Sequence, residues 1–238
     1  MTGQLVHIRE KGRGGPEPAA LGPVAVLRMA VYEPQGLSGR RLERRLYRAE
    51  RALVRAGASR VVLAPDFPYE ERLRLLRPVD TLPLRQAMAD VWAMGALELE
   101  GVEPRRGRVA LSAPRLCPEL MAAAERLCPQ VRGLTIDAPG GEEFARWLHG
   151  RFGLPVAPPG AGADVTLAFG PAGGRWGRTV ELYRGGAPGG LELSAPELEL
   201  PAGLEEQLLA LLWERGSLDR SGVRAVPAGT CREAESGV

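Results

Sequence analysis

The stretch VAVLRMAVYEPQGLSGRRLERRLYRAERALVRAGASRVVLA, residues 24–64, decides the fold because it contains one complete strand, helix and strand. Residues 24–32 form a nearly continuous apolar run, as a strand covered on both faces requires, and residues 60–64 form a second run. Ser38 is the predicted N-cap of the intervening helix, and Gly57 is its predicted stop. This order predicts a parallel sheet with a right-handed crossover.

The predicted helix is amphipathic, with an apolar stripe whose members recur at spacings of four, three, four and three. The apolar stripe consists of Leu42, Leu46, Ala49, Leu53 and Ala56. The other side carries a basic stripe of Arg40, Arg44, Arg48, Arg51 and Arg55. Such a stripe can follow a phosphate backbone, but Glu43 and Glu50 interrupt it. The pattern therefore favours a solvated helix face.

The same order of elements recurs later in the chain. Further strands are predicted at residues 109–112, 134–137 and 154–157. Further helices are predicted at residues 65–77, 83–99, 117–128, 142–152 and 201–215. Residues 165–169 and 179–183 read as two strands joined by a glycine-rich turn, which predicts an antiparallel hairpin near the C-terminal edge of the sheet. The sequence thus predicts the α/β class, with a mostly parallel sheet, flanking helices and a Rossmann-like order in two halves.

Composition shifts divide the chain into four predicted parts. These are a loose N-terminal segment over residues 1–22, a first α/β half over 23–104, a second α/β half over 105–226 and a disordered tail over 227–238. Within the first part, residues 5–8 are a predicted short edge strand, and residues 11–23 are glycine-rich and proline-rich, as in a linker.

Composition also narrows the class of protein. The chain is 45% hydrophobic and 25% charged, which is typical of globular proteins, and no apolar run approaches the ~20 residues that span a bilayer. Its start lacks the apolar core of a secretory signal, so a cytoplasmic location is expected. Lys occurs only at Lys11 and Asn is absent, which indicates a GC-rich bacterial genome that favours arginine. With a net charge of +2, the composition argues against a dedicated nucleic-acid binder.

Three cysteines, Cys117, Cys128 and Cys231, occur without a CxxC pair. Cys117 and Cys128 are eleven residues apart on one predicted helix, which separates them by ~16 Å along its axis. They can share neither a metal ion nor a disulfide in that helix. The expected role is therefore that of reduced structural cysteines.

In a parallel α/β sheet, ligands bind where strands end and helices begin. The sequence places Glu33, Asp66, Ser112 with Arg115, and Asp137 with Gly140 and Gly141 in such turns. Gly140 and Gly141 would let backbone N–H groups approach a phosphate at a helix start. Glu142 and Glu143 in the first helical turn would repel that phosphate, so a plain capped helix start is the alternative.

The motifs of known cofactor sites are missing. Neither GxGxxG nor GxxxxGK[ST] follows any predicted strand, and the glycines of residues 170–177 lead into a strand, as in a hairpin turn. We therefore predict no cofactor. Glu33, Asp66 and Asp137 would offer carboxylate ligands to a divalent cation if they converged on one edge of the sheet. Single acids after strands are also common caps and turn formers, so no metal site is predicted.

The two histidines do not suggest a nucleophilic site. His7 falls in the predicted loose segment, and His149 falls near the end of a predicted helix, where a basic residue complements the helix dipole. No GxSxG nucleophile elbow is present. A structural role for both histidines is the prediction.

The second half resembles a Rossmann-type domain in the order of its predicted strands and helices. A strand ending in Asp137 is followed by another that begins Ala163, Asp164 and Val165. This resemblance implies a fold and no cofactor.

Three hypotheses of function follow, and the sequence leaves open whether the protein is an enzyme. The first is a non-enzymatic protein that acts through protein contacts. The second is an enzyme or sensor that binds a small anionic, phosphorylated ligand at the strand ends through Ser112, Arg115, Asp137, Gly140 and Gly141. The third is nucleic-acid binding through the basic stripe, which requires a steep salt dependence.

Overall fold

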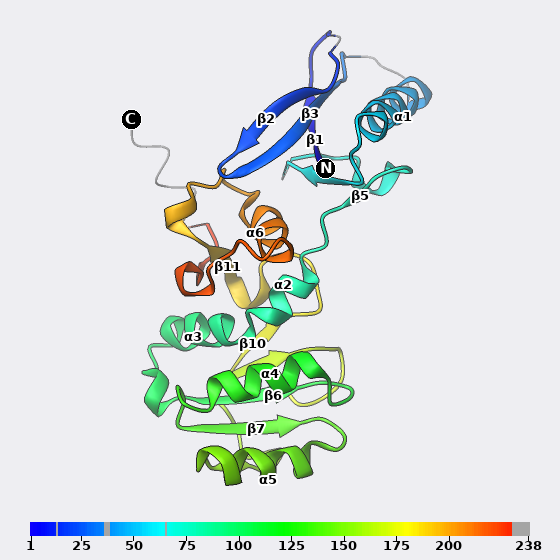
Figure 1. Cartoon of the computed structure of the whole chain (residues 1–238). Coiled ribbons are helices and arrows are strands. Elements are labelled where there is room, and N and C mark those ends of the chain that lie inside the picture. The colour runs from blue at the N-terminus through cyan, green and yellow to red at the C-terminus, as the bar shows by residue number, and fades with distance from the viewer. Residues whose placement is uncertain (13, 36–38, 65, 230–238) are drawn as a thin grey trace. The chain divides into compact units, whose positions relative to one another are not determined.

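The computed structural model describes residues 1–12, 14–35, 39–64 and 66–229. The chain forms two compact units, and each is an α/β unit with a parallel sheet and flanking helices (Figure 1). Unit 1 contains Met1–Thr81 and Ala195–Leu218, and unit 2 contains Leu82–Ser194 and the chain from Asp219 onward. The structure therefore differs from the expected division at residues 104 and 105, because the helices after Thr81 pack in unit 2 and a C-terminal helix returns to unit 1.

The sheet of unit 1 has the strand order β2-β3-β1-β4-β5. Its strands are β1 Thr2–Ile8, β2 Glu17–Leu21, β3 Val24–Tyr32, β4 Arg60–Leu63 and β5 Arg77–Pro78. Neighbouring strands are parallel except β2, which runs antiparallel to β3. The strands expected at residues 24–32 and 60–64 are thus confirmed, with β1 lying between them.

The N-terminal segment is where the structure departs most from expectation. Residues 1–22 are not loose: β1 is the central strand, and residues 2–5 within it are buried. β2 forms inside the expected linker because Gly22, at φ +57°, makes a tight turn that returns the chain along β3. Since β2 is an edge strand and largely exposed, it does not need the apolar residues by which a strand is recognised in the sequence.

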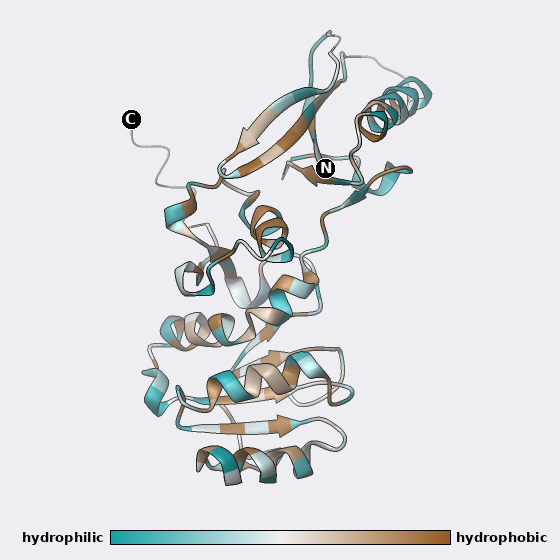
Figure 2. Ribbon diagram, viewed as in Figure 1, coloured by the Kyte–Doolittle hydropathy of each residue, from teal (hydrophilic) through white to brown (hydrophobic). Residues whose placement is uncertain are grey.

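The helix α1 Gly39–Arg55 packs its apolar stripe on the unit 1 sheet. Leu42, Leu46, Ala49 and Leu53 are buried with Leu5, Val31, Val61 and Leu63 of the strands in one hydrophobic cluster. Figure 2 shows hydrophobic residues along the strands and many hydrophilic residues on α1. Ala56 lies past the helix end and is exposed, and the expected cap Ser38 lies outside the described residues.

Two shorter elements complete unit 1. Instead of the expected helix over 65–77, a single 3-10 turn, Glu70–Arg72, is followed by β5, while Pro65 lies outside the described residues. The returning helix α6 Glu205–Glu214 contributes Gln207, whose amide donates to the carbonyl of Leu63 at 2.9 Å and accepts from its N–H at 3.0 Å. Gln207 thereby satisfies the backbone at the end of β4.

The sheet of unit 2 has the strand order β10-β9-β6-β7-β8, with all neighbours parallel. Its strands are β6 Arg108–Ser112, β7 Gly133–Asp137, β8 Val156–Ala157, β9 Val165–Ala168 and β10 Arg178–Glu181. Counted along the chain, the order across the sheet is 3-2-1-4-5, which is the Rossmann-like order. The Rossmann-like fold expected for the second half is therefore confirmed.

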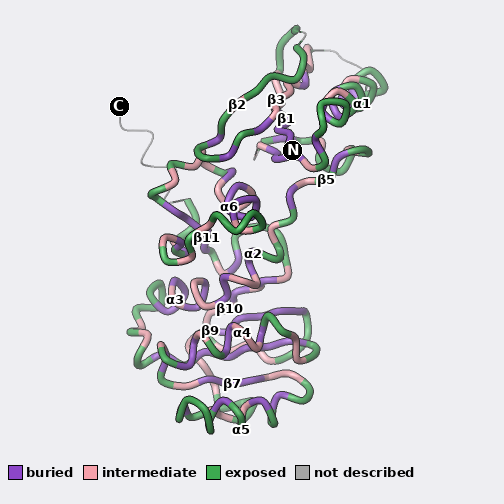
Figure 3. Tube along the Cα trace, viewed as in Figure 1, coloured by how far each residue is buried: buried purple, intermediate pink, exposed green. Residues whose placement is uncertain are grey.

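The described part of unit 2 contains four α-helices, and their buried segments are visible in Figure 3. They are α2 Leu82–Ala87, α3 Ala89–Leu99, α4 Pro118–Leu127 and α5 Gly141–Phe152. The single helix expected over 83–99 is broken at Met88, whose ψ of 21° departs from helical values. α3 contacts a two-stranded antiparallel sheet of β11 Leu191–Ser194 and β12 Arg224–Pro227, and a Cβ at Gly95 would lie only 2.4 Å from the carbonyl oxygen of Ala225.

The expected hairpin over residues 165–183 is wrong, because β9 and β10 are parallel. The intervening residues 169–177 form a crossover instead of a tight turn. A segment of that length can span roughly 30 Å when extended, more than the ~13 Å length of a four-residue strand, so it can return the chain to the start of β10. None of the helices in the described ranges is long and apolar enough to span a bilayer.

Candidate functional site

Ser112 and Asp137 lie next to each other at the carboxyl ends of β6 and β7, as the parallel order predicts. Ser112 is fully buried, and its hydroxyl donates to the carbonyl of Ala172 at 3.1 Å. The Asp137 carboxylate accepts a hydrogen bond from the backbone N–H of Gly174 at 2.5 Å. The crossover of residues 170–176 therefore lies directly on the strand ends where a ligand was expected.

Arg175 holds this crossover in place. Its Nη1 donates to the Ser112 hydroxyl at 3.1 Å, and its Nη2 donates to the carbonyl of Gly170 at 2.9 Å. Gly173 adopts φ +97°, and a Cβ there would lie 2.0 Å from the Ser112 oxygen. The rim of unit 2 between Ser112 and Asp137 is thus filled by the chain itself.

The other predicted residues of this rim do not join the contact. Arg115 is exposed, and the guanidinium at Ser112 is that of Arg175. Gly140 is the N-cap of α5 at φ +79° and is exposed, while Gly141 is buried against Ile136. The anion site expected from these residues stays a prediction, and the structure adds no ligand group to it.

The acids considered for one cation site belong to two different sheets. Glu33 follows β3 and Asp66 follows β4 in unit 1, whereas Asp137 ends β7 in unit 2. They therefore do not share a sheet edge, which corrects the convergence considered from the sequence.

At the carboxyl rim of unit 1, Glu33 joins His7 and Tyr69. The Glu33 Oε2 atom lies 2.8 Å from His7 Nε2 and accepts a short hydrogen bond from the Tyr69 hydroxyl. The Tyr69 bond, with smaller contributions from His7 and the charge of Arg9, holds the pKa of Glu33 below its ordinary 4.5, although burial opposes this. Burial and then the bond to Glu33 raise the pKa of Tyr69 above 10.0. This cluster was not predicted from the sequence, because His7 falls in the segment that was expected to be loose.

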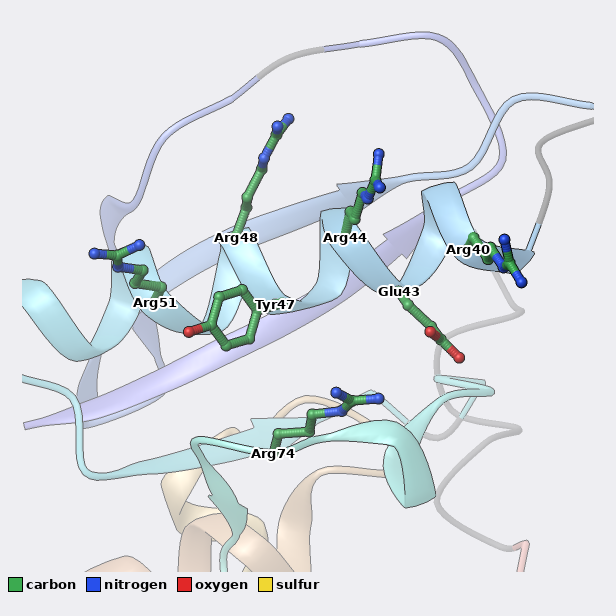
Figure 4. Close-up of a pocket in the computed structure, with 7 residues that line it drawn as sticks. All are labelled: Arg40, Glu43, Arg44, Tyr47, Arg48, Arg51 and Arg74. Carbon is green, nitrogen blue, oxygen red and sulfur yellow. The ribbon is translucent and has the colours of Figure 1, made fainter.

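A groove of about 550 Å³ runs between α1 and the segment that carries Arg74. We call it the arginine groove, and its lining residues are Arg40, Glu43, Arg44, Tyr47, Arg48, Arg51 and Arg74. Figure 4 shows Glu43 and Tyr47 on the side of α1 that faces Arg74, whereas the side chains of Arg44 and Arg48 point away from Arg74. Tyr47 is 43% exposed, so its ring is available to a ligand.

Glu50 connects α1 to the segment that carries Arg74 by hydrogen bonds. Its side chain is only 1% exposed, and its Oε1 accepts the backbone N–H groups of Arg74 at 3.0 Å, Leu75 at 2.8 Å and Leu76 at 2.9 Å. Three donors on one carboxylate oxygen compensate its removal from water. Glu50 is thus buried, which corrects the expectation that it interrupts the basic stripe on the exposed surface of the helix.

The guanidinium groups of the arginines that line the groove form no ion pair with any acid that the structure describes. Within the described parts of the chain, no ion pair includes the side chain of Arg40, Arg44, Arg48, Arg51 or Arg74. Glu43 is the single carboxylate among the lining residues. Four of these arginines were found in the sequence as a stripe, but Arg74 was not, because it reaches the groove only through the fold.

The comparison with protein-family models and with curated proteins found no match. Among solved structures, the quinate dehydrogenase from Corynebacterium glutamicum in complex with NAD is similar, with 17% identity and a TM-score of 0.26. The match spans 60% of this chain and 61% of that chain. Similarity at this level supports neither an activity nor a cofactor for this chain.

Proposed function

We propose that the protein binds a small phosphorylated ligand in the arginine groove of unit 1. The observation that supports this most directly is that five arginines and a single carboxylate, Glu43, are among the seven residues that line one groove. Guanidinium is the side-chain group best suited to phosphate oxygens, because its planar donors bind two of them at once.

The dimensions of the groove favour a small ligand. Its volume of about 550 Å³ falls within the range of small-molecule sites. Tyr47 lies among the arginines with its ring exposed, which suits a ligand that combines phosphates with a planar ring. A ligand of this kind is the second hypothesis from the sequence, moved from the strand ends of unit 2 to α1.

The test is calorimetric titration at low salt with ATP and with inorganic triphosphate. Each exposed arginine–phosphate pair contributes roughly 0.2–1 kcal/mol, so Arg44→Ala combined with Arg48→Ala should weaken the binding of both compounds by about twofold to thirtyfold. Tyr47→Ala should weaken only the binding of ATP. The matched control is Arg55→Ala, which removes an exposed arginine of the same helix that does not line the groove.

The outcomes separate the hypotheses. No binding of either compound, or equal losses in the double variant and the Arg55→Ala control, would overturn the proposal. Protein contacts, the first hypothesis from the sequence, predict no ligand binding and no rise in melting temperature with these compounds. Tight binding of single-stranded DNA together with weak binding of triphosphate would instead favour nucleic acid.

A further inference from the structure

A second groove, of about 500 Å³, lies in unit 2 and is therefore independent of the arginine groove. It is lined by α5, by the end of β7, and by β8 with its flanking residues, and we call it the edge groove. β8 is the outermost strand of its sheet and contains only Val156 and Ala157. Its length is limited by Pro155, Pro158 and Pro159, because proline has no N–H to donate to a neighbouring strand.

β8 and its flanking residues give the edge groove an apolar surface. Val156 and Ala157 are half-buried, and the three prolines are exposed. Ala145 of α5 also lines the groove, and its small side chain leaves room there. Apolar surface in a groove of this size favours a ligand that is itself partly apolar, because binding removes both surfaces from water.

Three polar side chains of α5 line the same groove. Glu142, Arg146 and His149 are exposed, and their spacing of four and three residues places them on one face of the helix. Glu142 and Arg146 are one turn apart, yet neither forms an ion pair with any residue that the structure describes. Their charges are therefore available to a ligand.

His149 adds a hydrogen-bond acceptor to the groove. Its Nδ1 lies 3.0 Å from the carbonyl oxygen of Leu154, and no described residue bonds to its Nε2. A carbonyl only accepts hydrogen bonds, so Nδ1 carries the proton, and the lone pair of the neutral imidazole is on Nε2. The polar residues of the groove thus offer a carboxylate and a lone pair to a cationic group, and a guanidinium to an anionic group.

We propose that the edge groove binds an α-amino acid with a large apolar side chain. Arg146 binds the α-carboxylate, whose two oxygens match the planar donors of a guanidinium. Glu142 accepts hydrogen bonds from the α-ammonium group, and Nε2 of His149 is a second acceptor for it. The side chain of the amino acid lies against Val156 and Ala157.

A zwitterion suits these residues better than a ligand with a single charge. The Cβ atoms of residues one turn apart on a helix are about 5–6 Å apart, so the ends of Glu142 and Arg146 can reach two opposite charges attached to one carbon. A simple carboxylic acid leaves Glu142 beside a like charge, and a simple amine does the same to Arg146. These two compounds are therefore the competing ligands that the experiment must separate.

The test is calorimetric titration of the full chain at low salt. L-phenylalanine and L-leucine should bind, and L-alanine should bind about tenfold more weakly because it lacks a large apolar side chain. Hydrocinnamate and phenethylamine keep the phenyl ring and lack the amine or the carboxylate, respectively. Each should bind about fivefold more weakly than L-phenylalanine, since it loses one exposed ion pair.

Two substitutions assign the charges to their residues. Arg146→Ala should weaken the binding of L-phenylalanine and hydrocinnamate by about twofold to fivefold, and it should strengthen the binding of phenethylamine. Glu142→Gln should weaken the binding of L-phenylalanine and phenethylamine, and it should strengthen the binding of hydrocinnamate. The matched controls are Arg151→Ala and Glu143→Gln, which change exposed residues of α5 that do not line the groove and should leave all affinities unchanged.

Ala145→Trp tests the position of the site. The indole should fill the groove and abolish the binding of L-phenylalanine, while the melting temperature shows whether the fold is kept. Titration of the same variant with inorganic triphosphate reports on the arginine groove alone, so the failure of one site can be told from the failure of the other.

Four results would overturn the proposal. They are no binding of either L-phenylalanine or L-leucine, equal affinities for L-phenylalanine and L-alanine, tighter binding of hydrocinnamate or phenethylamine than of L-phenylalanine, and wild-type binding of L-phenylalanine by folded Ala145→Trp. If Ala145→Trp loses its fold, the two charge variants decide, because both change exposed side chains. Wild-type affinities in both of them would overturn the proposal as well.

Discussion

Replacement of Glu50 tests whether the arginine groove is held together as described. Glu50 is buried in α1, and its Oε1 accepts the backbone N–H groups of Arg74, Leu75 and Leu76 at 2.8–3.0 Å. In Glu50→Ala these three donors lose their acceptor, and the segment that carries Arg74 should open more readily. Glu50→Gln keeps an uncharged oxygen of the same shape.

The expected magnitude follows from the geometry. A hydrogen bond to a charged group contributes about 1.5–3 kcal/mol. Arg74 and Leu75 are exposed and water can replace much of their bond, whereas Leu76 is 3% exposed and loses its partner outright. We therefore expect Glu50→Ala to lower the free energy of local opening by about 3 kcal/mol, and Glu50→Gln by about 1 kcal/mol.

Hydrogen exchange followed by mass spectrometry measures this opening directly. Since 1.4 kcal/mol corresponds to a factor of ten, the amides of residues 74–76 should exchange about 100-fold faster in Glu50→Ala and about fivefold faster in Glu50→Gln. Glu43→Gln is the control, because Glu43 is exposed on the same helix. If these amides exchange in Glu50→Ala at a rate within threefold of wild type, Glu50 does not hold residues 74–76 against α1, and the reasoning is refuted.

Two further predictions concern the rims of the two sheets. Gly173→Ala should destabilise unit 2 by about 2 kcal/mol or more, because Gly173 has φ +97° and its added Cβ would lie 2.0 Å from the Ser112 oxygen. An unchanged melting temperature would contradict the described path of the crossover. The pKa of Glu33 in the folded protein lies below its ordinary 4.5, so ionised Glu33 stabilises the folded state above pH 4.5. This stabilisation is lost as the pH falls through the lowered pKa. The free energy of unfolding by urea, measured from pH 7 to pH 3, should therefore differ between wild type and Glu33→Gln by an amount that shrinks below about pH 4.5. A difference that stays constant over this range would contradict the lowered pKa of Glu33.

Much of the fold follows from apolar pattern alone. The runs at β3 and β4 and the stripe of α1 are recognisable because their burial on the sheet demands apolar residues at fixed spacing. β1 was recognised only in part, since it begins with Thr2, Gly3 and Gln4, which are buried without being strongly apolar. The direction of β10 was missed because the path of residues 169–177, and not the composition of the turn, decides the pairing.

The residues of the sites were harder to predict, and for a physical reason. Ser112 and Asp137 could be placed together because parallel strands end at one edge, but the partner of a long side chain such as Arg175 depends on how a distant loop folds back. Glu50 did carry a signal in the sequence. It follows Leu46 by four residues and precedes Leu53 by three, which places it on the apolar side of α1, where a carboxylate must find donors.

The two candidate phosphate sites differ in whether their polar side chains are bound by the chain itself, and this difference indicates which of them is available to a ligand. In unit 2 the polar groups at the rim are satisfied by the chain: Arg175 binds Ser112 and loop carbonyls, and Asp137 binds Gly174. In unit 1 five arginines line one groove, and none of them forms an ion pair with an acid among the described residues. Like charges gathered in one groove raise the free energy of the empty protein, and an anion that binds there relieves the repulsion. Phosphate binding is therefore expected in unit 1, whereas the crossover of residues 170–176 must move before a ligand can occupy the rim of unit 2.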